Sequence, residues 1–113
     1  MGAMITGVQA QATVTDLGRA ESWYTSVLGS APDSRPMDGL LEWHLGGGFG
    51  VQVWSEPDRA GHSSMILIDD ALDDTAARLS AAGIEHGAPQ PGGGQRVLQL
   101  SDPDGNRIVF TGA

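Results

Sequence analysis

The chain has 113 residues, which suits one domain with a single hydrophobic core and leaves no room for two. Fourteen carboxylates against six arginines give a net charge of −8, and such a field repels nucleic-acid backbones and anionic membrane surfaces. The sequence has no cysteine and no lysine, which excludes disulfides, thiolate metal sites, a cysteine nucleophile and Schiff-base chemistry.

The N-terminal segment predicts a strand followed by a helix. Residues 8–15 alternate apolar and polar side chains with period two, which is typical of a strand with one buried face. A stripe at helical spacing then begins at Leu17, directly after Asp16, whose carboxylate is a good acceptor for the first helical amides. Gly29 favours a left-handed stop, so we expect the helix to end there.

The next segment predicts a hairpin. A stretch rich in Pro and Asp, residues 31–39, is interpreted as a loop with a weak edge strand. Residues 40–45 and 50–55 alternate on either side of three glycines at 46–48, which is typical of two strands joined by a tight turn. Residues 56–62 are polar and are interpreted as a linker.

The order of elements then restarts. Residues 63–68 predict a strand, Asp70 is predicted to cap a helix, and Gly83 is predicted to end it. The turn at 102–106 is interpreted as structural, because Pro103 presets φ and its Asp, Gly and Asn residues favour tight reversals. The remaining segments are predicted to be a loop with a possible edge strand at 86–94, a strand at 96–100 and a last strand at 107–111.

An internal repeat supports this division. Asp16 aligns with Asp70, and Gly29 aligns with Gly83, at one offset of 54 residues. The last strands match as well, since residues 51–53 correspond to residues 108–110 with a three-residue insertion between. Each unit of about 50 residues could bury its helix-facing side separately, which leaves the other faces of the two units to line something together.

The predicted fold class is α+β. One domain over residues 1–113 holds two tandem β-α-β-β-β modules, at about 5–55 and 63–112, joined by the linker at 56–62. Each helix covers one side of its own strands, so the other sides of the strands must line something together. We expect a curved mixed sheet around a ligand cleft, with the helices on the outer face.

Two segments carry a family resemblance that covers almost the whole chain. Residues 14–29, VTDLGRAESWYTSVLG, resemble the first strand–helix junction of the glyoxalase/bleomycin resistance protein/dioxygenase (vicinal oxygen chelate) superfamily. Residues 102–108, DPDGNRI, resemble its last hairpin. The resemblance implies a cleft for a small molecule and a homodimer whose clefts lie at the subunit junction.

The resemblance also implies four positions for metal ligands, which fall on Gln9, Gln52, Ser63 and Val109. Two amides, a hydroxyl and a hydrocarbon side chain would hold a divalent cation weakly, because they lack the charged or imidazole ligands that replace water. A one-residue slip would bring in His62, but it would turn its strand neighbours to the opposite face. We therefore predict no metal and no other cofactor, with a divalent metal as the alternative.

Strand parity defines the face that is expected to line the cleft. It combines apolar and aromatic side chains with neutral amides, which suits an amphipathic or planar organic ligand. Trp54 lies on this face, where it is expected to stack on a ligand, fill the cleft or pad a subunit contact. Arg96, at the mouth, is expected to meet an anionic ligand or a nearby carboxylate. The predicted ligand-binding residues are Gln9, Gln11, Glu42, His44, Gln52, Trp54, Met65, Arg96 and Gln99.

Glu42 and His44 lie two residues apart on one strand face, so their side chains are neighbours. They are either a general acid/base pair or an ion-paired strand edge. The preferred function is a small-molecule binding protein that sequesters its ligand, as in antibiotic-resistance members of the superfamily. The alternatives are a metal-dependent lyase, isomerase or dioxygenase, and a metal-free enzyme that uses these two residues.

The expected location is the cytoplasm. No apolar run approaches the ~20 residues that a membrane span requires. No cationic stretch leads into an apolar one near the N-terminus, so no export signal is visible. A small molecule and a second copy of the chain are the expected partners, and neither nucleic acid nor a membrane is expected.

Overall fold

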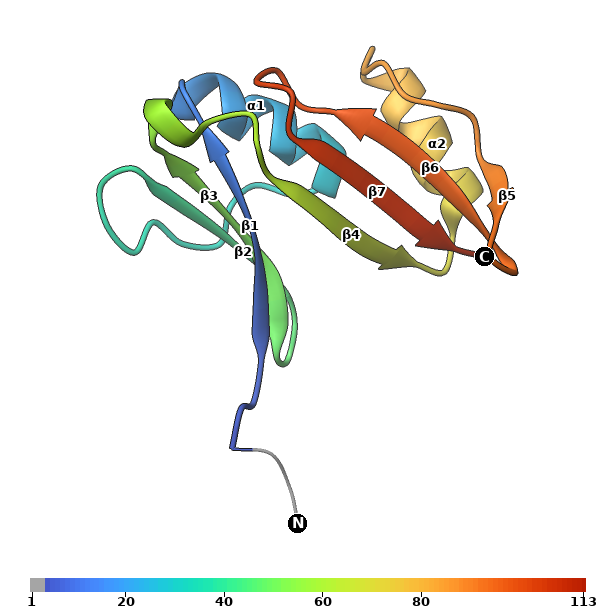
Figure 1. Ribbon diagram of the computed structural model, residues 1–113, viewed down its shortest axis with the longest axis horizontal. Coiled ribbons are helices and arrows are strands. Elements are labelled where there is room, and N and C mark those ends of the chain that lie inside the picture. Colours follow the sequence, from blue (N-terminus) through green and yellow to red (C-terminus); the bar gives the residue numbers. More distant parts are fainter. Residues whose placement is uncertain (1–3) are drawn as a thin grey trace.

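The computed structural model describes residues 4–113, and its elements run twice through a strand, a helix and further strands (Figure 1). The first half contains β1 (Val8–Val14), α1 (Leu17–Leu28), β2 (Leu40–Gly46), β3 (Phe49–Ser55) and a short 3-10 helix η1 (Pro57–Arg59). The second half contains β4 (Ser64–Asp69), α2 (Leu72–Ala81), β5 (Gln90–Gly92), β6 (Gln95–Ser101) and β7 (Arg107–Gly112). No helix within 4–113 is long and apolar enough to cross a membrane.

The strands form two mixed sheets rather than one continuous sheet. The first has the order β1-β3-β2 and the second has the order β4-β7-β6-β5. In each sheet the first strand of the module pairs in parallel with the last, and the other pairs are antiparallel. The edge strand expected at 31–39 is reduced to a single bridge between Ser34 and Glu42, whereas the one expected at 86–94 forms as β5. The α+β fold class is thus confirmed.

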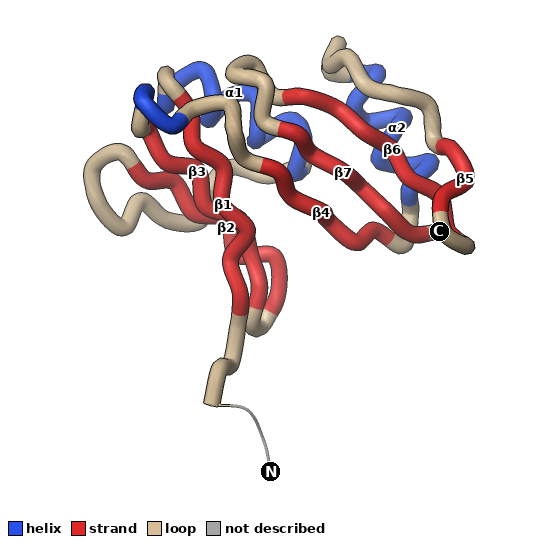
Figure 2. Tube along the Cα trace, in the orientation of Figure 1, coloured by secondary structure: helices blue, strands red, loops and turns tan. Residues whose placement is uncertain are grey.

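Both helices lie behind the sheets (Figures 1 and 2). The hydrophobic core is one cluster to which both helices and both sheets contribute buried residues. Helix α1 buries Ala20, Tyr24 and Val27, which recur at helical spacing on one side. This stripe packs against the inner faces of both sheets, where Trp43 and Leu98 are fully buried. The indole of Trp43 also donates a 2.8 Å hydrogen bond to the carbonyl of Ser30, so its one polar atom is satisfied.

The start of α1 follows the prediction and the start of α2 does not. Asp16 caps α1 by accepting a 3.0 Å hydrogen bond from the amide of Arg19. At α2 the N-cap position is Ala71, and the carboxylate that accepts hydrogen bonds is Asp69 rather than Asp70. The second helix therefore begins one residue later than the aligned repeat predicts.

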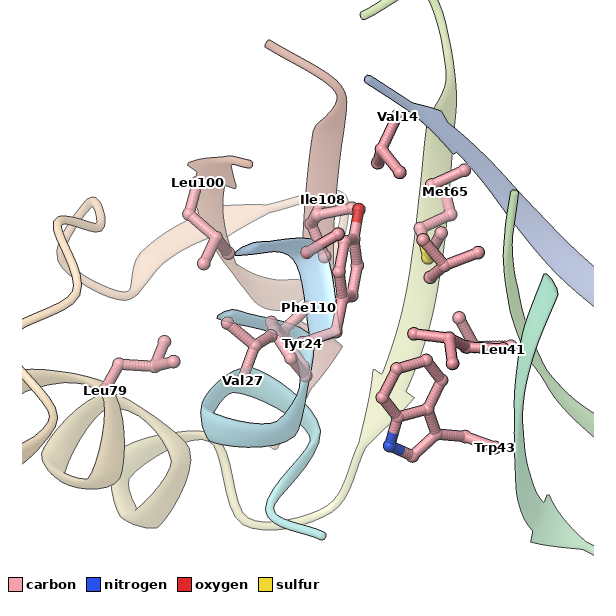
Figure 3. Packing of buried hydrophobic residues seen from close by; sticks show 14 of the residues in the cluster. Val14, Tyr24, Val27, Leu41, Trp43, Met65, Leu79, Leu100, Ile108 and Phe110 are labelled. Carbon is pink, nitrogen blue, oxygen red and sulfur yellow. The ribbon is translucent and has the colours of Figure 1, made fainter. Parts of the chain in front are cut away.

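This one-residue difference reverses the faces of β4. Met65 is only 5% exposed and lies in the core, and Leu67 packs against that core (Figure 3). Ile66 and Ile68 instead point to solvent, at 66% and 88% exposure. The prediction that Met65 faces the cleft is wrong, because period two turns every side chain over when the register shifts by one.

Hydrogen bonds from the turn before β7 join the two halves of the chain. The fully buried Asn106 donates from its side chain to the carbonyl of Thr13 on β1 at 2.8 Å and accepts from the amide of Ser63 at 2.8 Å. Its backbone amide donates to Asp102 within the turn. The polar groups of this turn are thus bonded to protein atoms, in agreement with its predicted structural role.

Candidate functional site

The open face of the first sheet carries a row of polar side chains across its three strands. Gln11 of β1 lies in register with Gln52 of β3, and Gln52 lies in register with Glu42 of β2. Registered residues on one face are neighbours, so their side chains meet directly. Gln11 Nε2 donates to Gln52 Oε1 at 2.9 Å, and Gln52 Nε2 donates to Glu42 Oε2 at 2.5 Å. His44 Nε2 completes this polar row with a 2.6 Å contact to Glu42 Oε1.

Glu42 is the charged centre of the polar row. The hydrogen bond from Gln52 holds the pKa of this carboxyl below its ordinary value, and His44 adds a second bond and a favourable charge. Partial removal from water acts in the opposite direction and is outweighed. Glu42 is therefore a carboxylate at neutral pH, with both oxygens engaged by protein donors.

A cleft of about 500 Å³ lies beside the Gln11 end of the polar row. Thr13 and Trp54, which are in register on β1 and β3, form part of its wall. The 3-10 helix η1 adds Arg59, which stands 3.9 Å from Glu56 in a loose, exposed ion pair. The complete lining is Gln11, Thr13, Trp54, Ser55, Glu56 and Arg59.

This lining combines three kinds of recognition group. Trp54 offers a partly exposed aromatic face, and Arg59 offers a cation that is held only weakly by its own chain. Gln11, Thr13 and Ser55 add neutral donors and acceptors. Such a set suits a planar molecule that carries polar or anionic groups at its edge.

The structure brings part of the predicted ligand set together and separates the rest. Gln9 and His44 line a second hollow of about 360 Å³ at the far end of the same sheet. Gln99 is exposed on the second sheet, opposite Val109. Arg96 turns toward α2, where two 3.0 Å hydrogen bonds join it to Asp73. Arg96 therefore belongs to a surface ion pair, and it does not lie at the mouth of the Trp54 cleft.

Glu56 and Arg59 line the candidate cleft, although neither is among the residues predicted from the sequence. Their segment was predicted to be a plain linker, but it forms η1 with Pro57 at its start. A proline at the first helical position followed by charged residues is a recognisable helix-start signal. That signal indicates the short helix, although it does not say which cleft the helix adjoins.

The residues at the four family positions for a metal do not fit a divalent cation. Gln52 uses both ends of its amide on Gln11 and Glu42. Ser63 shares the parity of the buried Met65, and its hydroxyl accepts a 3.1 Å hydrogen bond from the amide of Thr13, so the prediction that it lies on the ligand face is wrong. The one-residue slip in β4 leaves His62 and Ser64 exposed instead, and Val109 is a hydrocarbon. Gln9 and at most one imidazole then remain, which is too weak a set to displace the water shell of the ion. Within residues 4–113 no three His, Cys, Asp or Glu side chains cluster as a metal site.

An apolar cleft, distinct from the two polar hollows, lies between the two sheets and away from the polar row. It has a volume of about 540 Å³ and is lined by Val8, Ala10, Leu45, Phe49, Gly50, Ile66, Leu67 and Ile68. Val8 and Phe49 are 70% and 54% exposed, because the ends of β1 and β3 project past the helices (Figures 1 and 2). Leu45 shares the face of the buried Trp43 by alternation, but it is exposed here for the same reason.

Known proteins share this fold and part of this sequence. The profile of the Glyoxalase/Bleomycin resistance protein/Dioxygenase superfamily matches residues 8–110. A glyoxalase/bleomycin resistance protein from Catenulispora acidiphila is 31% identical, with a TM-score of 0.87 over 95% of this chain and 97% of that one. TnmS3, an antibiotic binding protein from a Streptomyces species, is 23% identical, with a TM-score of 0.82 over 99% of this chain and 98% of that one.

A bleomycin-binding protein solved in complex with bleomycin is 19% identical, with a TM-score of 0.79 over 94% of this chain and 97% of that one. No curated protein matches the sequence. The fold expected from segments 14–29 and 102–108 is confirmed by these comparisons.

Proposed function

This chain belongs to the Glyoxalase/Bleomycin resistance protein/Dioxygenase superfamily, and we propose that it binds an amphipathic, planar organic molecule without changing it chemically. The observation that carries the proposal is the cleft of about 500 Å³ in which Trp54 stands beside Arg59 and Gln11. Sequestration requires only affinity, and these groups supply stacking, charge and hydrogen bonds. The proposed binding surface is therefore the open face of the first sheet.

A binding role without a resident metal is supported by the hydrogen bonds that already occupy the side chains of Gln52 and Ser63. The amide of Gln52 is bonded to its neighbours at both ends, and the hydroxyl of Ser63 is bonded to β1. Metal binding would require these hydrogen bonds to break, and the side chains released would be only neutral, weak ligands. The metal-dependent lyase, isomerase and dioxygenase activities of the superfamily have no comparable support in these residues.

The class of ligand follows from the relatives as well as from the cleft. One similar structure is described as an antibiotic binding protein, and another was solved in complex with bleomycin. Both are statements about those proteins, and their sequences share 23% and 19% identity with this chain. They recommend antibiotic natural products, bleomycin among them, as compounds to test beside planar ones.

Tryptophan fluorescence tests the proposal directly. Of the three tryptophans, Trp43 is fully buried and Trp23 packs edge-on against Tyr24 at 4.8 Å, so Trp54 is the one at the cleft. Titration with a panel of planar natural products should give saturable quenching with at least one compound. Trp54→Phe should abolish that signal and weaken binding by calorimetry, whereas Trp23→Phe should leave both unchanged. Failure of every compound to bind the wild-type chain would overturn the proposal.

We propose further that the chain forms a homodimer through its apolar cleft. The eight residues that line this cleft are uncharged, although each chain carries a net charge of −8. The net charges of two such chains repel each other, so association is favoured only through a surface that is itself uncharged and whose burial offsets this repulsion. Exposed apolar surface of this kind is typical of an interface. β1 and β4, which supply part of the lining, are edge strands of their sheets and adjoin one another within the chain.

The oligomeric state tests this second proposal. Light scattering coupled to size-exclusion chromatography should give twice the chain mass of 11.7 kDa at micromolar concentration. Phe49→Ser with Ile66→Ser should give a folded monomer, since both side chains are exposed in the single chain. Arg59→Ser, at an exposed site away from the apolar cleft, serves as the control and should stay dimeric. A wild-type monomer at high micromolar concentration would contradict the proposal.

A further inference from the structure

The direction of every hydrogen bond in the polar row is set at Glu42. A carboxylate only accepts hydrogen bonds, so the atom of Gln52 that lies 2.5 Å from it must be the Nε2 donor. The reversed amide would place its oxygen against the carboxylate, where two partial negative charges would repel each other. Glu42 thereby fixes which end of the Gln52 amide faces β1.

The same logic fixes the next amide along the row. With its nitrogen directed at Glu42, Gln52 presents Oε1 to Gln11, and an oxygen accepts only from a donor. Gln11 therefore contributes Nε2 to this 2.9 Å bond, and its own Oε1 becomes the last acceptor of the polar row. Gln11 is exposed and belongs to the wall of the Trp54 cleft.

His44 stabilises the other end of the polar row without affecting its direction. Its Nε2 contacts the second oxygen of Glu42, at 2.6 Å, and its backbone amide donates to Asp33 at 2.7 Å. Removing the imidazole would leave Glu42 as an acceptor for Gln52. The direction of the bonds therefore depends on Glu42 and does not depend on His44.

We propose that Glu42 is a positioning residue for ligand specificity: through Gln52 it holds Gln11 Oε1 as an oriented acceptor, so that the cleft selects planar ligands with an N–H or O–H group at the ring edge. The proposal rests on the proposed binding function of this cleft and adds the chemical class that the cleft prefers. Glu42 is two side chains away from the ligand and acts only through the amides. A planar ligand whose ring edge carries only acceptors would meet the Gln11 oxygen without a hydrogen bond.

Two flat, nearly isosteric probes separate these classes. Indole-2-carboxylate carries a ring N–H, benzofuran-2-carboxylate carries a ring oxygen in its place, and both offer a carboxylate to Arg59. Wild-type protein should bind the indole compound about tenfold more tightly in an NMR titration, the scale of one unmatched polar group. Glu42→Gln should bring the ratio of the two dissociation constants close to one, because a neutral amide both donates and accepts. His44→Ala should leave the ratio as in wild type.

A measurement without ligand separates the proposal from the binding function. In wild-type protein the one hydrogen-bonded Nε2 proton of Gln52, and that of Gln11, should be protected from exchange and shifted from its free-amide position. Glu42→Gln should lose this protection, and His44→Ala should retain it. Equal binding of the two probes to wild-type protein would overturn the selectivity while leaving the binding function in place. Unprotected amides in wild-type protein would overturn the positioning role whether or not either probe binds.

Discussion

The hydroxyl of Tyr24 donates a 2.7 Å hydrogen bond to the carboxylate of Asp102, a residue 78 positions further along the chain. Tyr24 is fully buried on α1, and Asp102 is 4% exposed at the turn before β7, so this bond ties the first helix to the last hairpin inside the core. Asp102 also accepts from Asn106 and from the amide of Asp104, which satisfies the rest of the buried carboxylate.

Tyr24→Phe should therefore lower the free energy of unfolding by about 1–3 kcal/mol, the cost of leaving a buried charged acceptor short of one donor. The ring still fills its place in the core, so the fold should survive. Urea denaturation measures the change. Ser26→Ala on the same helix, at a partly exposed site, is the control and should change stability by less than about 0.5 kcal/mol. Equal stability of Tyr24→Phe and wild type would mean that the bond contributes nothing.

The same residue should control stability at alkaline pH. Burial raises the pKa of Tyr24 above its ordinary value, and the neighbouring Asp102 carboxylate raises it further. A group whose pKa is raised by folding stabilises the protein fully below its unfolded pKa, about 10 for tyrosine, and this stabilisation is lost as the pH rises above that value. Above pH 10 the unfolded chain releases the tyrosine proton while the folded chain retains it.

Tyr24 is the single tyrosine, and the sequence has no lysine or cysteine, so no other side chain titrates between about pH 9 and pH 11.5. Above pH 10 the free energy of unfolding should fall by about 1.4 kcal/mol for each pH unit. Denaturant melts at several pH values measure this slope. The free energy of unfolding of the Tyr24→Phe variant should not depend on pH over the same range. A slope that persists in this variant would contradict the assignment of the pH dependence to Tyr24.

Glu42 should remain ionised at a pH where an exposed glutamate is protonated. The hydrogen bond from Gln52 is the largest cause of its lowered pKa, and the bond from His44 is the second. Gln52→Leu should therefore raise the pKa of the Glu42 carboxyl more than His44→Ala does, as followed by carbon-detected NMR. A group with a lowered pKa stabilises the fold above its unfolded pKa, and the effect is lost as the pH falls through the folded value. A larger rise in His44→Ala would contradict this order.

The sequence indicates the faces of strands that alternate strictly. β1, β2 and β3 each alternate, and the inward faces predicted for them are buried at Val14, Trp43 and Val53. Their outward faces place Gln11, Gln52 and Glu42 together, because register neighbours on one face must meet. The hydrogen-bonded polar row itself was not predicted, since strand order within a sheet depends on long-range pairing.

β4 shows where this reasoning fails. Residues 65–68 are Met-Ile-Leu-Ile, a continuous apolar run with no alternation of apolar and polar side chains, so the pattern does not indicate which face is buried. The face was then decided by aligning Asp70 with Asp16, and Asp69 is an equally good acceptor one residue earlier. Because two adjacent carboxylates both satisfy a capping rule, the sequence leaves the register undecided by one residue. The division into two sheets and the position of Arg59 also depend on packing that no local pattern encodes.

The register of β4 yields the last prediction. Met65→Ala should lower the free energy of unfolding by about 2–5 kcal/mol, because it removes most of a side chain that is only 5% exposed in the core. Ile66→Ala, on the neighbouring residue at 66% exposure, should cost less than about 1 kcal/mol in the monomer. Measurements at two protein concentrations separate any contribution of Ile66 to the proposed dimer, since only that contribution depends on concentration. If the uncorrected alignment with Asp16 held, Ile66 would face the core and the order of the two costs would be reversed.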